Sequence, residues 1–296
     1  MVEPRAFTAE SFRRDLVAAA SAVGAPHDPD VASAVYAAFP EPFHTGSVLW
    51  RTTGQAGAPL SYRVFPTDSV DTTEQALASG LLRQHHPLLP LARSWAKLYD
   101  GKPLHSCSFD ADFGLTKTWF YFGTKRPHDE ILGAAEVAPA LAARIGEFAD
   151  MGLRHISFAA VDWRSGSVVL DFDVAGPMSP ADLNRYVALT GSTAIPAETA
   201  DTVVRQISRD YCVALAVNAT NGVALDVGFS VLDFAACDLP SLPERLARFF
   251  GEFPVSPNDF NVLGWEFGRR GSHIKAERQY RGDIRTVLDM WMNATN

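Results

Sequence analysis

Cysteine is scarce in this chain of 296 residues, which contains only three. Cys107, Cys212 and Cys237 lie far apart and show none of the close spacings that hold a metal ion. An odd number of scattered cysteines is typical of a reducing compartment rather than of a disulfide framework. No apolar run is long enough to span a membrane, and residues 1–14 lack the apolar core of a signal peptide. We therefore expect a cytoplasmic protein without a membrane partner.

Basic residues are also fewer than acidic ones. Lysine and arginine together number 26 against 34 acidic residues, which gives a formal net charge of -8. Because recognition of nucleic-acid phosphates needs a basic face, nucleic acid is not an expected partner. The sequence also lacks glycine-rich nucleotide-binding loops, the H-E-x-x-H zinc motif, the G-x-S-x-G nucleophile elbow and the D-D-x-x-D run of magnesium-dependent prenyl ionisation. These absences argue against the enzyme classes that depend on such motifs.

What the chain does contain is five pairs of short alternating strand patterns, at intervals of roughly fifty residues. Each pair is rich in Val, Phe, Trp, Tyr and Leu and is broken by a turn signal such as Gly54 or Gly271. Asp110 and Asp112 are interpreted as turn residues of the second pair. Such pairs are typical of antiparallel hairpins. The predicted strands are Gly46–Arg51 with Leu60–Phe65, Leu104–Phe109 with Leu115–Phe122, His155–Trp163 with Ser167–Asp173, Tyr211–Val217 with Ala224–Leu232, and Asn261–Phe267 with His273–Tyr280.

Helical patterns fill the gaps between the hairpins. One helix is predicted to begin at Asp71 with capping-box chemistry, and another covers Ser179–Leu189. Ten antiparallel strands with helices on one side favour closure into a barrel, because closure removes both sheet edges. We therefore predict an α+β fold with residues 1–296 as one domain. It is a closed ten-stranded antiparallel barrel surrounded by helices, with a lumen wide enough for a small molecule.

Charged residues stand inside several of these apolar strands. Because successive side chains point to opposite faces of a strand, Lys117 shares a face with Trp119 and Tyr121. Lys275 and Glu277 share one face of the last strand in the same way. A closed barrel hides its inner face from bulk solvent, so charges on that face need partners or a ligand. The charged positions therefore predict a binding chamber.

Six segments carry a family resemblance: GSVLWRTT, LSYRVF, GLTKTWFYFG, HISFAAVDWR, DYCVALAV and NVLGWEFGRRGSHIKAERQY. From about Phe7 to Trp291 the chain resembles the ABBA aromatic prenyltransferases, and especially the branch that dimethylallylates 4-hydroxyphenylpyruvate for aminocoumarin antibiotics. The resemblance implies a barrel in which a dimethylallyl or geranyl diphosphate meets an electron-rich aromatic acceptor. The prenyl group would then be transferred by Friedel-Crafts alkylation. Members of this branch typically work without a divalent metal, so no cofactor is expected.

The resemblance also implies roles for residues of the inner face. Glu277 matches a carboxylate that meets the acceptor hydroxyl and helps to remove the proton lost on alkylation. Ser61 stands where a magnesium-dependent relative has an aspartate. Cys212 matches a small wall position, and no histidine can be placed beside it to make it a nucleophile. The expected diphosphate-binding residues are Arg51, Arg63, Lys117 and Lys275, and the expected pocket walls are Trp119, Tyr121, Ser157, Val169, Cys212, Ala214, Gly228 and Ser230.

Several inner positions depart from the family pattern. Asp226 replaces an arginine that grips the diphosphate, and Val169 replaces an asparagine that helps to hold it. Asp171 replaces a tyrosine, and Ser157 replaces an arginine that the hydroxyphenylpyruvate branch can use on the acceptor carboxylate. A different acceptor is therefore expected.

Asp226 and Asp171, candidate catalytic residues together with Glu277, leave several alternatives open. In a prenyltransferase they orient basic partners or recruit Mg2+ to bridge the phosphates. In a second interpretation the barrel no longer uses a prenyl diphosphate and performs acid-base or cyclisation chemistry on an aromatic intermediate. In a third it is a non-catalytic carrier of a small aromatic molecule. A purely structural alternative is that the two aspartates form ordinary salt bridges with Arg164 or Arg205 near the barrel rim. We favour a prenyltransferase, and we expect a monomer because a closed barrel has no edge that demands a partner.

Overall fold

All five predicted hairpins are present in the computed structural model, which describes residues 7–207, 211–233, 240–252 and 260–295. Cys237 lies outside these ranges. The strand ends fall within two residues of the predicted ends, except that β4 continues to Pro127. A bulge after Tyr121 interrupts the pairing of β4 with β5. The strands are β1 (Ser47–Thr53), β2 (Ser61–Phe65), β3 (Leu104–Asp110), β4 (Gly114–Pro127), β5 (His155–Asp162), β6 (Ser167–Val174), β7 (Tyr211–Asn218), β8 (Ala224–Leu232), β9 (Asn261–Gly268) and β10 (Gly271–Arg281).

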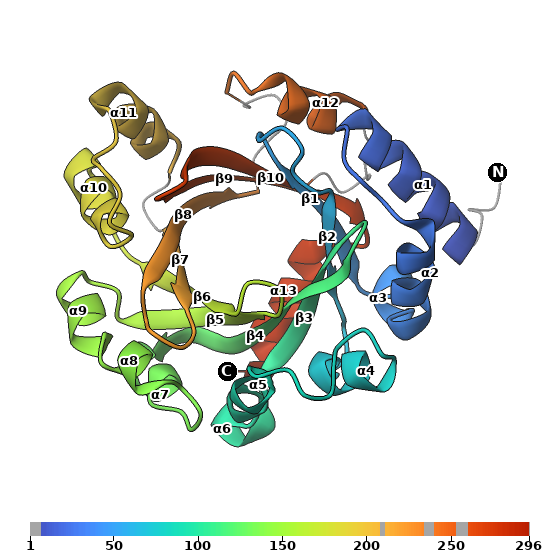
Figure 1. The fold of residues 1–296 in the computed structure, drawn as a ribbon, viewed down its shortest axis with the longest axis horizontal. Coiled ribbons are helices and arrows are strands. Elements are labelled where there is room, and N and C mark those ends of the chain that lie inside the picture. The colour runs from blue at the N-terminus through green and yellow to red at the C-terminus, as the bar shows by residue number, and fades with distance from the viewer. Residues whose placement is uncertain (1–6, 208–210, 234–239, 253–259, 296) are drawn as a thin grey trace.

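The strands close into a barrel in the order in which they follow along the chain. Each strand pairs antiparallel with its neighbours in sequence, and β1 pairs with both β2 and β10. Figure 1 looks into the opening of this ring, with helices around its outside. Within the described residues no strand is left at a sheet edge, so the predicted ten-stranded antiparallel barrel is confirmed.

Helices cover the outside of the barrel, and several begin where side chains cap them. Asp71 accepts hydrogen bonds from the first-turn amides of α4, although Glu74 pairs with Arg93 instead of completing the predicted capping box. Ser179 forms a full capping box at the start of α10. None of the described helices is long and apolar enough to cross a membrane. The helices are α1 (Ala9–Ala22), α2 (Pro29–Ala38), α3 (Glu41–His44), α4 (Thr72–Ala78), α5 (Leu89–Ala96), α6 (Leu98–Gly101), α7 (His128–Leu132), α8 (Pro139–Ala142), α9 (Ile145–Asp150), α10 (Pro180–Ala188), α11 (Ala197–Gln206), α12 (Glu244–Glu252) and α13 (Ile284–Thr295).

The main hydrophobic core lies between the outer face of the strands and the helices. Trp50 of β1 is only 1% exposed, and its ring centroid lies 5.8 Å from that of Phe12 in α1. Tyr62 and Tyr280, on the two neighbouring strands, approach the same indole at 5.7 and 4.7 Å. Outward aromatic residues thus bind the helices to the barrel. Because side chains alternate along a strand, the intervening residues point into the lumen.

Candidate active site

The inner faces of the strands enclose a cavity of about 500 Å³. All the site residues predicted from the sequence line this cavity, including the four cations and the small residues of the wall. Among the described residues its acidic and basic side chains are nearly balanced, so the lumen is charged but close to neutral. The basic lining residues are Arg51, Arg63, Lys117, Arg270 and Lys275, and the acidic ones are Asp162, Asp171, Asp173, Asp226, Glu266 and Glu277.

The two ends of the cavity differ in character. Tyr121 of β4 stacks on Trp291 of α13 with ring centroids 5.9 Å apart, so α13 lies at the Tyr121 end. Apolar residues of this helix, among them Leu288 and Met292, line the cavity there. Lys117 comes four residues earlier on β4 and pairs with Asp162, at the opposite end of the strand. The lumen is therefore apolar near α13 and charged toward its other mouth.

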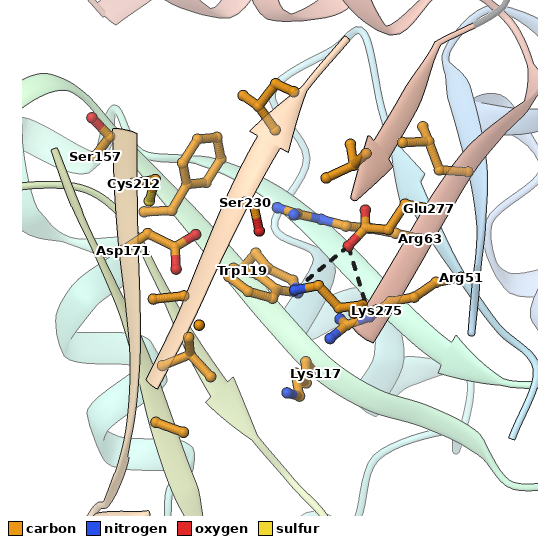
Figure 2. A pocket seen from close by; sticks show the side chains of 18 of the residues that line it. Arg51, Arg63, Lys117, Trp119, Ser157, Asp171, Cys212, Ser230, Lys275 and Glu277 are labelled. Atoms are coloured by element: carbon orange, nitrogen blue, oxygen red, sulfur yellow. Dashed lines mark ion pairs between the residues drawn. The ribbon is translucent and has the colours of Figure 1, made fainter. Parts of the chain in front are cut away.

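Two cations and two carboxylates form the centre of the charged region. Arg51 of β1 lies 3.7 Å from Glu277 of β10 and, through its Nη2 atom, 3.7 Å from Glu266 of β9. Lys275 Nζ lies 3.2 Å from the same Glu266 oxygen and 4.0 Å from Glu277. Figure 2 shows Arg51 and Lys275 both directed toward Glu277. Each cation is thus shared between two carboxylates.

Glu266 is the main functional candidate that the sequence interpretation missed. Burial alone would raise the pKa of this carboxyl, but Lys275, a hydrogen bond from His273 and Arg51 outweigh it and hold the pKa well below its usual range. His273 Nε2 lies 2.9 Å from its Oε2 atom. The alternation Gly264, Glu266, Gly268 on β9 was a usable signal. A Cβ on Gly264 would lie 3.3 Å from Lys275 Cε, so this glycine makes room for the lysine chain.

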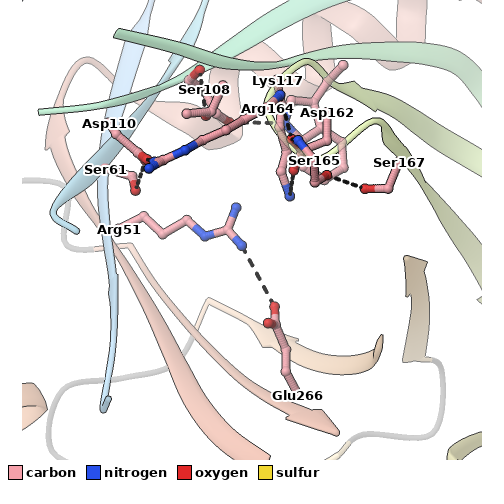
Figure 3. A network of polar contacts seen from close by, with 12 residues as sticks. Arg51, Ser61, Ser108, Asp110, Lys117, Asp162, Arg164, Ser165, Ser167 and Glu266 are labelled. Atoms are coloured by element: carbon pink, nitrogen blue, oxygen red, sulfur yellow. Dashed lines mark hydrogen bonds and ion pairs between the residues drawn. The ribbon is translucent and has the colours of Figure 1, made fainter. Parts of the chain in front are cut away.

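A second polar network lies at the charged mouth (Figure 3). Lys117 Nζ is 3.3 Å from Asp162, and its pKa is lowered by burial and by the nearby Arg51. Asp110 is buried, accepts a hydrogen bond from Ser61 at 2.7 Å and pairs with Arg164 at 3.0 Å. Asp110 does close the predicted hairpin turn, since its carbonyl accepts a hydrogen bond from the Phe113 amide, but its side chain also reaches into this network.

Arg63 of β2 lies among aromatic rings deeper in the lumen. Its guanidinium carbon lies 4.2 Å from the ring centroid of Trp119, 4.5 Å from that of Phe65 and 5.5 Å from that of Phe158. Its Nε donates a hydrogen bond to Ser106 at 2.9 Å, while its Nη2 is buried without a hydrogen-bond partner among the described residues. Burial lowers the pKa of Arg63 to about 10, so the group stays charged at neutral pH.

Asp171 of β6 faces the lumen with a buried oxygen. Its Oδ1 atom has no hydrogen-bond partner among the described residues. Burial raises the pKa of Asp171 to about 6, against the opposing effects of Lys275 and Arg63. Arg164 pairs with Asp110, and Arg205 donates to Thr202, so neither explains Asp171 as a salt bridge at the barrel rim.

Asp226 of β8 lies apart from Asp171. Burial and the neighbouring Glu266 raise its pKa, while Arg270, His273 and Lys117 oppose the rise. Asp171 is in register with Ala214 and, across the next strand, with Gly228, two residues beyond Asp226. At a strand spacing of about 4.8 Å the backbones of the two residues are roughly 10 Å apart across the sheet. No described group of three His, Cys, Asp or Glu residues is arranged to hold a metal.

The remaining predicted wall residues gather beside Asp171. Asp173 accepts a hydrogen bond from Ser157. Cys212 is in register with Asp173, and burial raises the pKa of its thiol well above the usual value, which disfavours a nucleophilic thiolate. Trp119 donates its indole N–H to Ser108 at 3.0 Å and packs with Val169. This region offers an aromatic wall and acidic groups, which suits an aromatic ligand with hydrogen-bond donors.

The sequence profile of the aromatic prenyltransferase Orf2 family matches residues 7–292. The chain belongs to this family. The predicted membership of the aromatic prenyltransferases is thereby confirmed, and the chain is an enzyme that transfers prenyl groups rather than a passive carrier.

Two relatives illustrate the breadth of the family. This aromatic prenyltransferase is 40% identical over 286 residues to a 4-hydroxyphenylpyruvate 3-dimethylallyltransferase from Streptomyces niveus, an alignment covering 96% of this chain and 88% of the relative. It is 32% identical over 297 residues to an aromatic prenyltransferase from Sclerotinia sclerotiorum, covering 98% and 96% of the two chains. Among solved structures, 5-dimethylallyltryptophan synthase from Streptomyces coelicolor superimposes with a TM-score of 0.57 at 10% identity, over 92% of this chain and 97% of that one. At that identity the likeness shows the fold alone.

Proposed function

We propose that this prenyltransferase moves a dimethylallyl or geranyl group from its diphosphate to a carbon of an electron-rich aromatic ring inside the lumen. The observation that carries the proposal is that Arg51, Lys117 and Lys275 line the same cavity as the indole of Trp119. Cations suit a departing diphosphate, and aromatic faces suit an allylic cation. Both requirements of the chemistry are therefore met within one chamber.

The proposed reaction balances without an added reactant. The bond between C1 of the prenyl group and the diphosphate oxygen breaks, and its electron pair leaves with the diphosphate. The allylic cation accepts an electron pair from a ring carbon, which forms the new C–C bond. That carbon then loses its proton, so that prenylated arene, pyrophosphate and a proton are the products. Enclosure of the cation by Trp119, Tyr121 and the apolar residues of α13 limits its capture by water.

Glu277 is the proposed acceptor-side carboxylate. It lies 3.7 Å from Arg51 and 4.0 Å from Lys275, so it can contact an acceptor hydroxyl while staying beside the cations of the diphosphate site. A diphosphate bound by Arg51 and Lys275 must displace Glu266, Glu277 or both from these cations. Asp226 is proposed to position Lys117 and Arg270, which lie near it. Ala214, Gly228, Ser230 and Val169 are proposed to supply space for the two substrates.

Donor binding is proposed to need no metal, because Arg51, Lys117 and Lys275 supply the positive charge directly. Isothermal titration with dimethylallyl and geranyl diphosphate, each with and without Mg2+, tests this point. We expect one of the two to bind in the absence of Mg2+, and Lys275→Ala to weaken that binding. Binding only with Mg2+ would overturn the metal-free proposal, and no binding of either donor under any condition would overturn the choice of donors. Product formation from a panel of phenols, naphthols and indoles, with Glu277→Gln as the comparison, then tests the transfer itself.

We also propose that the enzyme acts as a monomer in the cytoplasm. Within the part of the chain that the structure describes, the closed barrel offers no edge strand for a partner, and three scattered cysteines are consistent with a reducing compartment. Light scattering after size-exclusion chromatography measures the mass directly, and a species of twice the mass of the chain would contradict the monomer.

A further inference from the structure

Two polar atoms in the lumen are buried without hydrogen-bond partners among the described residues. They are Nη2 of Arg63, a donor, and Oδ1 of Asp171, an acceptor. Both residues line the cavity, and the charge of each acts on the other. A buried polar atom without a partner costs free energy, so a ligand that satisfies it gains affinity. Together the two atoms call for a ligand that carries both an acceptor and a donor.

Three other carboxylates of the lumen already have partners. Glu266 contacts Arg51, Lys275 and His273, and Glu277 contacts the first two of these cations. Asp173 is hydrogen-bonded by Ser157. Asp171 therefore differs from these three in having a buried oxygen without a hydrogen-bond partner among the described residues.

The position of Asp171 suits the acceptor rather than the diphosphate. Strand β6 begins at Ser167, which is in register with Asp162, the partner of Lys117 at the charged mouth. Asp171 comes four residues later, roughly 13 Å farther along the strand at the usual rise. Its neighbours in register are Phe158 on β5 and Ala214 on β7. Phe158 provides an aromatic wall, and the small side chain of Ala214 leaves space. Figure 2 shows the Asp171 carboxylate directed into the pocket on the side of Trp119. An aromatic ring beside it could place a polar side arm against this carboxylate.

We propose that Asp171 binds a protonated amine on the aromatic acceptor, and that Arg63 binds an oxygen of the same molecule where one is present. The proposal rests on prenyl transfer as the proposed function, and it names the class of acceptor. The acidic side chains Asp171, Asp173 and Glu277 surround this part of the lumen, with Lys275 and Arg63 as the neighbouring cations. Such a field favours an ammonium group over a free carboxylate.

Three phenols that differ only in their side arm test this proposal: 4-hydroxyphenylpyruvate, tyrosine and tyramine. Calorimetric titration of the enzyme preloaded with pyrophosphate should show tighter binding of tyramine and tyrosine than of the keto acid. Asp171→Asn keeps the shape and removes the charge, so it should weaken tyramine binding roughly ten- to hundredfold and change binding of the keto acid little. Arg63→Gln should weaken tyrosine more than tyramine, because only tyrosine has a carboxylate.

Asp173→Asn is the matched control, since it removes the same charge two residues away from a carboxylate that already has a partner. It should reduce the preference for amines much less than Asp171→Asn does. Equal or tighter binding of the keto acid to the wild-type enzyme, or an unchanged tyramine affinity in Asp171→Asn, would overturn the proposal. Pyrophosphate binding and far-UV circular dichroism of each variant separate these outcomes from misfolding. If the prenyl diphosphates bind and react while Asp171→Asn has no effect on selectivity, the acceptor proposal fails and prenyl transfer stands.

Discussion

The outer and inner faces of the same strands show opposite chemistry. On β1 the outward Trp50 is buried among Phe12, Tyr62 and Tyr280, while the next residue, Arg51, points inward and lies between two carboxylates. Outward positions are filled with large apolar side chains that pack on helices. Inward positions combine charged residues with small ones, and a cavity remains. The comparison suggests that stability comes mainly from the outer face, while the inner face is left free to carry groups that destabilise the empty protein.

The sharpest test of this division compares two tryptophans. Trp50→Ala removes an outward indole that helices cover, and we expect a loss of roughly 3–5 kcal/mol in the free energy of unfolding. Trp119→Ala removes an inward indole beside a cavity that water can enter, and we expect a loss of at most about 2 kcal/mol. Urea unfolding of both variants measures the difference. Equal losses would show that the inner wall is as important for stability as the outer core.

Asp171 offers a test in the opposite direction, because its removal should stabilise the protein. Its pKa of about 6 in the folded state lies above the ordinary value of 3.8, so the folded chain holds this proton more tightly than the unfolded chain does. Stability is therefore lost as the pH rises from about 4 through 6. The groups that act on it are Lys275, Arg63, Asp173 and Glu277.

Asp171→Asn should consequently be more stable than the wild-type enzyme by roughly 1–3 kcal/mol at pH 7.5, and by little at pH 4.5. Unfolding free energies of the two proteins at both pH values give the comparison. A variant that is less stable at pH 7.5 would mean that the carboxylate has a stabilising partner in the empty lumen.

Glu266 provides the smallest of the expected effects. Because the Glu266 carboxylate lies beside Arg51 and Lys275, Glu266→Gln should leave Glu277 as the remaining carboxylate on both cations and tighten the binding of inorganic pyrophosphate by roughly tenfold, about 1.4 kcal/mol. Calorimetric titration without Mg2+ is the measurement. Glu147→Gln, which alters an exposed pair with Arg144, is the matched control and should have no effect. Weaker binding to Glu266→Gln would show that Glu266 orients the cations rather than competing with the diphosphate.

The sequence predicted the outer face better than the inner one. Outward residues follow a simple alternation that any strand of this kind repeats, so the ten strands and their closure could be predicted. Alternation also gave the set of residues that share the lumen. Alternation did not show which of these residues pair with one another. Arg51 and Glu266, for example, lie on strands whose relative stagger is fixed only when the barrel closes.

Contacts between hairpins could not be predicted for a related physical reason. Asp110 belongs to the predicted turn, but its side chain also reaches Ser61 and Arg164 on other hairpins. Arg164 therefore pairs with Asp110 rather than with Asp171 or Asp226. Glu266 was overlooked although its glycine neighbours mark an inward face with room for long side chains.

A crystal structure with a non-hydrolysable dimethylallyl thiolodiphosphate most directly tests whether the charged part of the lumen is a donor site. We predict that the diphosphate oxygens lie within hydrogen-bond distance of Arg51, Lys117 and Lys275, with Glu266 displaced and the prenyl chain directed toward Trp119. A diphosphate bound outside the barrel, with Arg51 and Lys275 still paired to Glu266 and Glu277, would contradict this assignment.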